Sequence, residues 1–330
     1  MKKEPILSVK DLGISFSQYT KGLRRRELEV ITNLDIDLYE GEILAVVGSS
    51  GSGKSLLAHA ILGILPDNAT TEGNIIYKGK TLTLKDKEKL RGREIVFIPQ
   101  SVNFLDPLMK VSKQVKISIE NKEKANKRQR DIFNKYGLDK KVDNLYPFEL
   151  SGGMARKVLL STALVSDCKV IIADEPTTAL DVTIQAQILD LMKDLKSKLD
   201  TSIILITHDL GVVADLCSRI NVMYGGLIVE EGTTEDIFYR GKHPYTWGLL
   251  RSVPNPKSEL KEKLIPIEGQ PPDLLKPPVG CPFTARCDYA MKICKEKQPP
   301  LFEVGEGHRA ACWLCHENAP KVESPIRGEE

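Results

Sequence analysis

The sequence predicts an α/β protein with a mainly parallel core sheet, an antiparallel β portion at the start and a small appended module. Three observations support this fold class. Short apolar segments of buried-strand type alternate with helical segments through most of the chain. A glycine-rich loop separates the first such strand from a helix, which is the opening unit of a parallel α/β sheet. After Arg251 the composition becomes rich in proline and then in cysteine.

The bulk composition is that of an ordinary globular protein. The 330 residues are 41% hydrophobic and 28% charged, enough for one large domain with a smaller appendage. The 47 Lys and Arg residues nearly balance the 45 Asp and Glu residues, which argues against a nucleic-acid partner. The start lacks the apolar core of a secretory signal, and no apolar run approaches the roughly 18–20 residues needed to span a bilayer. We therefore expect a cytosolic or peripheral chain.

The elements follow from periodicity and turn residues. Alternating apolar residues predict strands early in the chain, and fully apolar runs predict buried strands later. The expected strands are at 6–16, 28–38, 43–47, 170–173 and 203–206, and the expected helices begin near Lys54 or occupy 120–136 and 151–165.

Composition divides the chain into four parts. We expect one nucleotide-binding domain at 1–253 with a helical subdomain at about 102–165, because no internal repeat is present. A proline-rich linker at 254–280, a cysteine-rich module at 281–316 and a polar tail at 317–330 follow.

Residues 48–55 match the phosphate-binding loop pattern G-x-x-x-x-G-K-[ST] between a strand and a helix. Glycines allow successive backbone N–H groups to turn toward phosphate oxygens, and the helix N-terminus favours the same anions. The lysine is expected to reach the terminal phosphates, and the last serine to ligate Mg²⁺. The candidate residues are Gly48, Ser49, Gly51, Ser52, Gly53, Lys54 and Ser55.

Polar residues after three short strands complete a candidate hydrolytic site. Asp174 ends a buried strand and is expected to bind Mg²⁺ directly or through water, and Glu175 is expected to accept a proton from the attacking water. Gln100 can contact both metal and water, and His208 can sense the γ-phosphate. The catalytic candidates are Glu175, His208 and Gln100, and the Mg²⁺ ligands are Ser55, Gln100 and Asp174.

The run Leu150-Ser151-Gly152-Gly153-Met154 resembles the signature of the ATP-binding-cassette (ABC) family. The resemblance implies the P-loop NTPase fold of that family, with ATP and Mg²⁺ as ligands. It also implies that Ser151, Gly152 and Gly153 face the γ-phosphate on a partner cassette, so that two ATP molecules are sandwiched between two chains. The segment Ala179-Leu180-Asp181 resembles the loop by which the two sites communicate, which makes Asp181 a candidate residue of the nucleotide site. Phe16 aligns with the family's adenine-stacking aromatic residue, and Tyr19 is the alternative.

Three segments resemble the ATPase subunits of dipeptide and oligopeptide importers: 173–189, His243-Pro244-Tyr245-Thr246 and Gly280-Cys281-Pro282-Phe283. The resemblance covers nearly all of 5–316. It implies ATP hydrolysis coupled to peptide import, at the cytoplasmic face of the membrane. The implied partners are a second ATPase subunit, expected to be a different chain, two permease subunits and an extracellular substrate-binding protein. One departure is Ala155-Arg156-Lys157, where the family usually has Arg-Gln-Arg.

Two other functions remain open. Importers of nickel complexes, other metals, glycosides or other small solutes belong to the same branch, and cargo is selected by other subunits. A soluble ABC ATPase of DNA repair or translation is the competing class, although such chains usually carry two cassettes or large insertions.

The seven cysteines are unevenly placed. Cys168 and Cys217 lie in apolar stretches and are expected in the core. The other five gather near the C-terminus, which in a reducing cytosol suggests metal or redox chemistry. Four thiolates suit a [4Fe–4S] cluster or tetrahedral zinc, and zinc sites usually contain tight C-x₂-C pairs. Four of the five, Cys281, Cys287, Cys294 and Cys312, resemble the ligands of a [4Fe–4S] cluster in this branch.

The wide spacing of Cys281, Cys287 and Cys294 favours the cluster over zinc. Cys315 is interpreted as a spare, with replacement of Cys312 as the alternative. His308 and His316 are interpreted as bystanders, with membership of a zinc site as the alternative, and unligated thiols are the third possibility for the cysteines. Because the module has little apolar content, we expect a bound metal to stabilise its fold.

Overall fold

The computed structural model describes residues 4–20, 24–178, 185–186, 188–190, 192–194, 201–253 and 266–326. The chain forms two compact units. The first unit comprises Met1–Asp37, Leu44–Thr81 and Thr207–Glu330, and the second comprises Leu38–Ile43 and Leu82–Ile206. None of the helices in the described part of the chain has the length and apolar character needed to cross a membrane.

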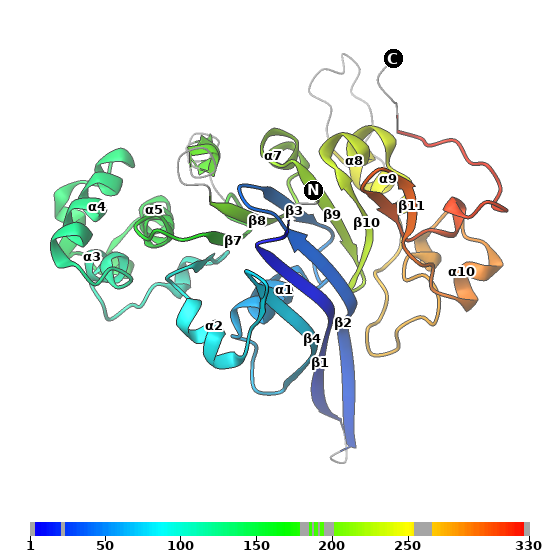
Figure 1. Ribbon diagram of the computed structural model, residues 1–330, viewed down its shortest axis with the longest axis horizontal. Helices are drawn as coiled ribbons and strands as arrows, with labels where there is room; N and C mark the ends of the chain where they lie inside the picture. Colours follow the sequence, from blue (N-terminus) through cyan, green and yellow to red (C-terminus); the bar gives the residue numbers. More distant parts are fainter. Residues whose placement is uncertain are drawn as a thin grey trace. The chain divides into compact units, whose positions relative to one another are not determined.

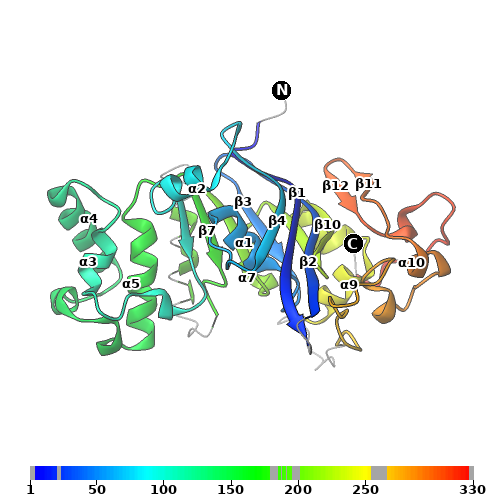
Figure 2. The same ribbon diagram turned by 90° about the horizontal axis from the view of Figure 1, so that it is seen from below.

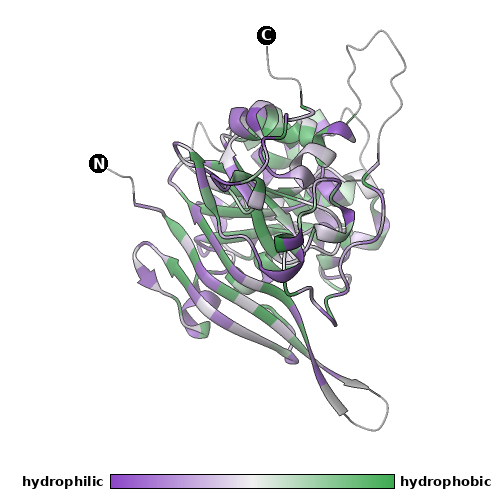
Figure 3. Ribbon diagram, turned by 90° about the vertical axis from the view of Figure 1, so that its right-hand side faces the viewer, coloured by the Kyte–Doolittle hydropathy of each residue, from purple (hydrophilic) through white to green (hydrophobic). Residues whose placement is uncertain are grey.

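The first unit begins with an antiparallel sheet in the order β2-β1-β4-β5 (Figure 1). Its strands are β1 (Leu7–Thr20), β2 (Arg24–Leu38), β4 (Ala69–Tyr77) and β5 (Lys80–Thr81). Strands β1 and β2 form a hairpin. Hydrophilic and hydrophobic residues alternate along it (Figure 3), as expected for strands with one face packed and one face in water. The sequence predicted the antiparallel portion, but both hairpin strands are longer than expected.

A second set of strands in the first unit runs in the order β11-β12-β10-β9-β3. β3 pairs with β9 in parallel, and the later strands pair antiparallel. These strands are β3 (Ile43–Val47), β9 (Arg219–Tyr224), β10 (Leu227–Thr233), β11 (Phe302–Gly305) and β12 (His308–Ala310). Two strands from the cysteine-rich region therefore extend the set that contains β3.

Helices of the first unit adjoin these strands (Figure 2). They are α1 (Lys54–Leu62), α7 (Leu210–Leu216), α8 (Thr234–Arg240), α9 (Pro244–Arg251) and α10 (Lys292–Glu296). His243 caps α9, because its Nδ1 accepts a hydrogen bond from the Tyr245 N–H at 3.0 Å, and proline occupies the first helical position.

The second unit combines three parallel strands with a helical portion. The strands run in the order β8-β7-β6 and are almost fully buried, as the apolar runs predicted. They are β6 (Ile95–Ile98), β7 (Val170–Asp174) and β8 (Ser202–Thr207). The helices are α2 (Leu84–Leu90), α3 (Val111–Lys116), α4 (Lys122–Lys135) and α5 (Gly152–Leu164). α4 and α5 occupy the two stretches in which helices were predicted.

Candidate functional site

The glycine-rich loop joins β3 to α1 in the first unit. Gly53 caps α1 with a left-handed φ of 99°, and a Cβ there would lie 2.9 Å from Cγ1 of Ile31. A Cβ at Gly48 would lie 2.1 Å from the carbonyl oxygen of Met223. Glycine is therefore required at both positions, and the loop can fold tightly enough to turn its backbone N–H groups toward an anion.

Two side chains of this loop can donate hydrogen bonds to phosphate oxygens, and a third can ligate a cation. Lys54 is buried, and its Nζ donates to the carbonyl oxygens of Gly48 and Ser49, both at 2.9 Å. The Ser52 hydroxyl is buried without a hydrogen-bond partner among the described residues, so it fits a phosphate oxygen. Ser55 is exposed, and its hydroxyl is open to a cation. These residues fit the predicted ATP and Mg²⁺.

The catalytic candidates of the second unit lie together. Asp174 is buried at the end of β7, and Glu175 follows with a left-handed φ of 44°. The Glu175 N–H donates to the carbonyl oxygen of Ile206 at 2.8 Å. The Glu175 carboxylate accepts from Gln100 Nε2 at 2.6 Å and from Thr178 Oγ1 at 3.1 Å. The structure therefore brings Gln100 and Glu175 into direct contact.

Arg156 joins the same two loops from α5, and the sequence marked it only as a departure from the family's glutamine. Arg156 is 3% exposed, and its guanidinium donates to four backbone carbonyl oxygens. The acceptors are Pro99 at 2.8 Å, Gln100 at 2.7 Å, Glu175 at 3.0 Å and Pro176 at 3.1 Å. Burial lowers the pKa of Arg156, and the nearby carboxylate at the end of β7 opposes this shift. A single side chain thus connects the loops after β6 and β7.

The signature segment forms the start of α5. The Ser151 Oγ accepts a hydrogen bond from the Met154 N–H at 3.3 Å. Ser151 and Gly152 are exposed, and a Cβ at Gly152 would meet nothing within 4 Å. The open first turn of this helix can receive an anion, as the signature resemblance predicts.

The remaining nucleotide candidates are less defined. His208 is exposed in the first unit, between β8 and the Asp209 cap of α7. Phe16 is half-buried on β1. The side chain of Tyr19 and all of Asp181 lie outside the described residues, so adenine stacking and communication between sites stay predictions.

The predicted cluster ligands share one cavity. Its lining includes Cys281, Cys287, Cys294 and Cys312, together with His243, Phe283 and Trp313. Cys315 is not among the lining residues. Burial raises the pKa of the Cys287 thiol to about 11. Cys168 and Cys217 are buried, as predicted.

The expected metal-bound module is not itself shown. In the described part of the chain, no group of three or more His, Cys, Asp or Glu side chains is arranged to hold a metal ion. The thiols that line the common cavity are donors of the type that zinc and iron–sulfur clusters take.

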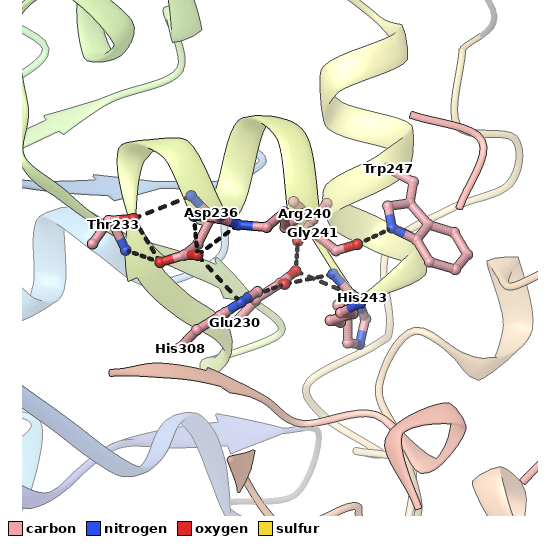
Figure 4. Close-up of polar contacts among 10 residues, drawn as sticks. Glu230, Thr233, Asp236, Arg240, Gly241, His243, Trp247 and His308 are labelled. Carbon is pink, nitrogen blue, oxygen red and sulfur yellow. Dashed lines mark hydrogen bonds and ion pairs between the residues drawn. The ribbon is translucent and has the colours of Figure 1, made fainter. Parts of the chain in front are cut away.

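His308, interpreted as a bystander to the metal site, is not among the residues that line the cysteine cavity and belongs to a buried network around Glu230 (Figure 4). The Glu230 carboxylate is fully buried and accepts from the backbone N–H groups of Lys242 at 2.6 Å and His243 at 3.0 Å. It also accepts from Thr246 Oγ1 at 2.5 Å and from His308 Nε2 at 2.8 Å. This network connects β10, the start of α9 and β12, and each partner satisfies part of the buried charge.

Comparisons with known proteins agree with this geometry. A family model described as "ABC transporter" matches residues 31–178, and one described as "Oligopeptide/dipeptide transporter, C-terminal region" matches residues 229–294. The chain is 48% identical over 337 residues to the oligopeptide transport ATP-binding protein OppD of Bacillus subtilis (strain 168), covering 97% of this chain and 92% of that protein.

A second relative is the dipeptide transport ATP-binding protein DppD of Lactococcus lactis subsp. cremoris (strain MG1363). It is 44% identical over 335 residues, covering 98% of this chain and 94% of that protein. Among solved structures, the dimeric structure of MJ0796, a bacterial ABC transporter cassette, has a TM-score of 0.60 and 26% identity, covering 69% of this chain and 98% of that chain. The chain therefore belongs to the ABC transporter ATPases, in the family of oligopeptide and dipeptide transport ATP-binding proteins.

Proposed function

We propose that this chain is the ATP-hydrolysing subunit of a membrane importer of dipeptides or oligopeptides. The supporting observation is the similarity to peptide transport ATP-binding proteins along 97% of the chain, including the C-terminal region. The chain would act at the cytoplasmic face of the membrane with a second, different ATPase subunit. Two permease subunits and an extracellular substrate-binding protein would complete the importer.

The proposed chemistry assigns a role to each loop. The 48–55 loop and Lys54 would bind the β- and γ-phosphates, and Ser55, Gln100 and Asp174 would hold Mg²⁺, whose charge would offset that of the phosphates. Glu175 orients the attacking water and accepts its proton, and His208 donates a hydrogen bond to the γ-phosphate. Ser151–Gly153 act on the ATP of the partner cassette.

Uptake by cells tests the function and its cargo. A strain lacking this chain would be supplied with the wild-type chain or with Lys54→Ala, and uptake of a labelled dipeptide, a labelled oligopeptide and a nickel complex would be measured. We expect only the wild-type chain to restore peptide uptake. Restoration of nickel uptake alone would identify a metal-complex importer. Normal uptake of all three in the deletion strain would favour a soluble, non-transport ATPase.

We further propose that Cys281, Cys287, Cys294 and Cys312 hold a [4Fe–4S] cluster that stabilises the cysteine-rich module. The support is the single cavity that these four side chains line and the position of Cys315 outside its lining. Protein purified without oxygen should be brown and contain four irons per chain, as the cluster type requires.

Serine substitution separates the ligands from the other cysteine. Replacing any of the four by serine should remove most of the iron, whereas Cys315→Ser should retain it. Colourless protein with one zinc per chain would show that the cysteines bind zinc and not a cluster. Iron loss in Cys315→Ser together with iron retention in Cys312→Ser would show that Cys315, and not Cys312, is the fourth ligand.

A further inference from the structure

The peptide unit between Gly48 and Ser49 is held from two opposite sides. The Gly48 carbonyl oxygen accepts from Lys54 Nζ at 2.9 Å, and the Ser49 N–H donates to the Tyr245 hydroxyl at 2.7 Å. A trans peptide is planar, so its C=O and N–H point in opposite directions. Tyr245 therefore fixes the orientation of the carbonyl group that anchors the phosphate-binding lysine.

Tyr245 is held in turn by aromatic rings, one of which comes from the cysteine-rich region. It is fully buried at the start of α9. Its ring centroid lies 4.4 Å from that of Tyr224 and 5.4 Å from that of Phe283. Phe283 also contacts Tyr224 edge to face at 5.2 Å. Phe283 follows Cys281 by two residues and lines the same cavity, so the packing around Tyr245 includes that cavity's wall.

We propose that Tyr245 is a positioning residue of the nucleotide site, and that Phe283 of the cysteine-rich region holds it in place. Tyr245 keeps the Gly48–Ser49 peptide turned so that Lys54 has a fixed carbonyl anchor. The folded state of the C-terminal region thereby determines how well the phosphate-binding loop is preorganised for ATP.

The test compares two tyrosines of the same aromatic cluster. Tyr245→Phe keeps the ring and removes the acceptor of the Ser49 N–H. Tyr224→Phe removes a hydroxyl that accepts from Arg286 at 3.2 Å. Affinity for ATP and ADP would be measured by titration of the full chain, with thermal unfolding of each variant. We expect Tyr245→Phe to bind nucleotide on the order of tenfold more weakly, and Tyr224→Phe to bind like the wild type.

The same titration tests the link to the C-terminal region. Phe283→Leu should weaken nucleotide binding, and adding it to Tyr245→Phe should weaken binding less than the two separate effects predict. Wild-type affinity in Tyr245→Phe, or equal losses in both tyrosine variants, would overturn the positioning role. Fully additive effects of Phe283→Leu and Tyr245→Phe would overturn the link through Phe283.

A separate observation concerns the imidazole of His243. Its Nδ1 accepts from the Tyr245 N–H, and a ring that accepts there carries its proton on Nε2. The Nε2 atom is buried and has no hydrogen-bond partner among the described residues. His243 also lines the cavity of the four cysteines, and Figure 4 shows its ring turned away from the Glu230 carboxylate. Buried donors nearly always have an acceptor, so an acceptor is missing here.

We infer that the group held by the four cysteines accepts a hydrogen bond from His243 Nε2–H, an inference that rests on the proposed cluster. Hydrogen bonds to cluster and cysteine sulfurs help to set the reduction potential. A donor stabilises the extra negative charge of the reduced state, so its loss should make the potential more negative.

His243→Asn is the informative variant, because asparagine keeps a helix-capping acceptor and withdraws the donor from the cavity. His316→Asn is its matched control: His316 Nδ1 likewise accepts from a backbone N–H two residues later, but this bond is exposed. The potential should become more negative only in His243→Asn. Brown protein with an unchanged potential in His243→Asn would overturn the role of His243 alone. Wild-type protein without iron would overturn the cluster and this inference with it.

Discussion

Glu175 occupies a backbone conformation that few non-glycine residues adopt. Its φ of 44° is held by the hydrogen bond to Ile206, while Gln100 and Thr178 hold its carboxylate. Such a conformation costs about 1–3 kcal/mol and persists where the surroundings determine it, often at functional sites. The carboxylate is therefore oriented before ATP binds.

Replacing Glu175 by glutamine should separate binding from hydrolysis. The amide has nearly the same shape but cannot accept a proton, so steady-state ATPase activity should fall on the order of 10²–10⁴-fold. Binding of ATP should remain, because the groups of the 48–55 loop that bind the phosphates are unchanged. Activity would be measured after reconstitution with partner subunits, with exposed Glu303→Gln as the control. Turnover above half of the wild-type value would contradict the role of Glu175.

Arg156→Met should reduce turnover through misplacement of Gln100 and Glu175. Methionine fills much of the volume but supplies none of the four hydrogen bonds to the loop carbonyl groups. Small displacements of catalytic groups cost up to about 10²-fold in rate, so we expect kcat to fall by at least about tenfold while nucleotide affinity of the isolated chain is kept. Lys157→Met is the control, since its Nζ donates to Tyr136 O at 3.0 Å. An equal loss in both variants would indicate general damage to α5.

At the scale of the element, α5 presents an exposed N-terminus with a serine cap. Ser151→Arg should leave nucleotide affinity of the isolated chain nearly unchanged but prevent ATP-dependent association of two cassettes. The added cation and bulk lie where the partner's phosphate is expected. Association of chains carrying Glu175→Gln would be followed by size-exclusion chromatography, with Ser151→Thr as a capping control. A loss of affinity in the monomer as large as that of Lys54→Ala would show that this helix acts on the chain's own nucleotide.

The sequence predicts the elements whose residues carry a strong local pattern. β3, β7 and β8 are continuous apolar runs, and α4 and α5 have helical periodicity and capping residues. The outer part of the first hairpin was missed because residues 17–20 are mostly polar and residues 24–27 are charged, so neither stretch shows apolar alternation. β11 and β12 were missed because they are only four and three residues long.

The site residues that lie in a strong local sequence pattern could be predicted, and those that depend on distant contacts could not. Glycines, Lys54, Asp174 and Glu175 lie in motifs whose spacing fixes their chemistry. Arg156 contacts residues up to 57 positions away in the sequence, and Tyr245 contacts Ser49, which is 196 positions away. A single sequence carries no signal for such distant pairs. The orphaned nitrogen of His243 likewise depends on packing alone.

At the scale of the whole first unit, the cysteine-rich region is tied to the preceding strands. β12 pairs with β10 at Glu230↔Ala310 and Glu231↔Arg309, and the His308–Glu230 bond adds a buried polar contact. Covering β10 in this way removes an otherwise open strand edge.

His308→Leu should weaken this attachment. It leaves the fully buried Glu230 carboxylate short of one donor, which costs about 1–3 kcal/mol of unfolding free energy. Denaturant unfolding and trypsin cleavage near the C-terminus would measure the effect. His316→Leu, at a half-buried position outside this network, is the control. Equal stability of the His308 variant and the wild type would show that the contact is not stabilising.

The β10–β12 pairing also has a consequence for biosynthesis. β10 ends at Thr233 and β12 begins at His308, so about 75 residues must be translated before the partner strand exists. At about 5–20 residues per second, this interval lasts on the order of 4–15 seconds. During that time the nascent chain carries a bare strand edge beside the ribosome. A chaperone that shields extended backbone would then matter most before the last part of the message is read.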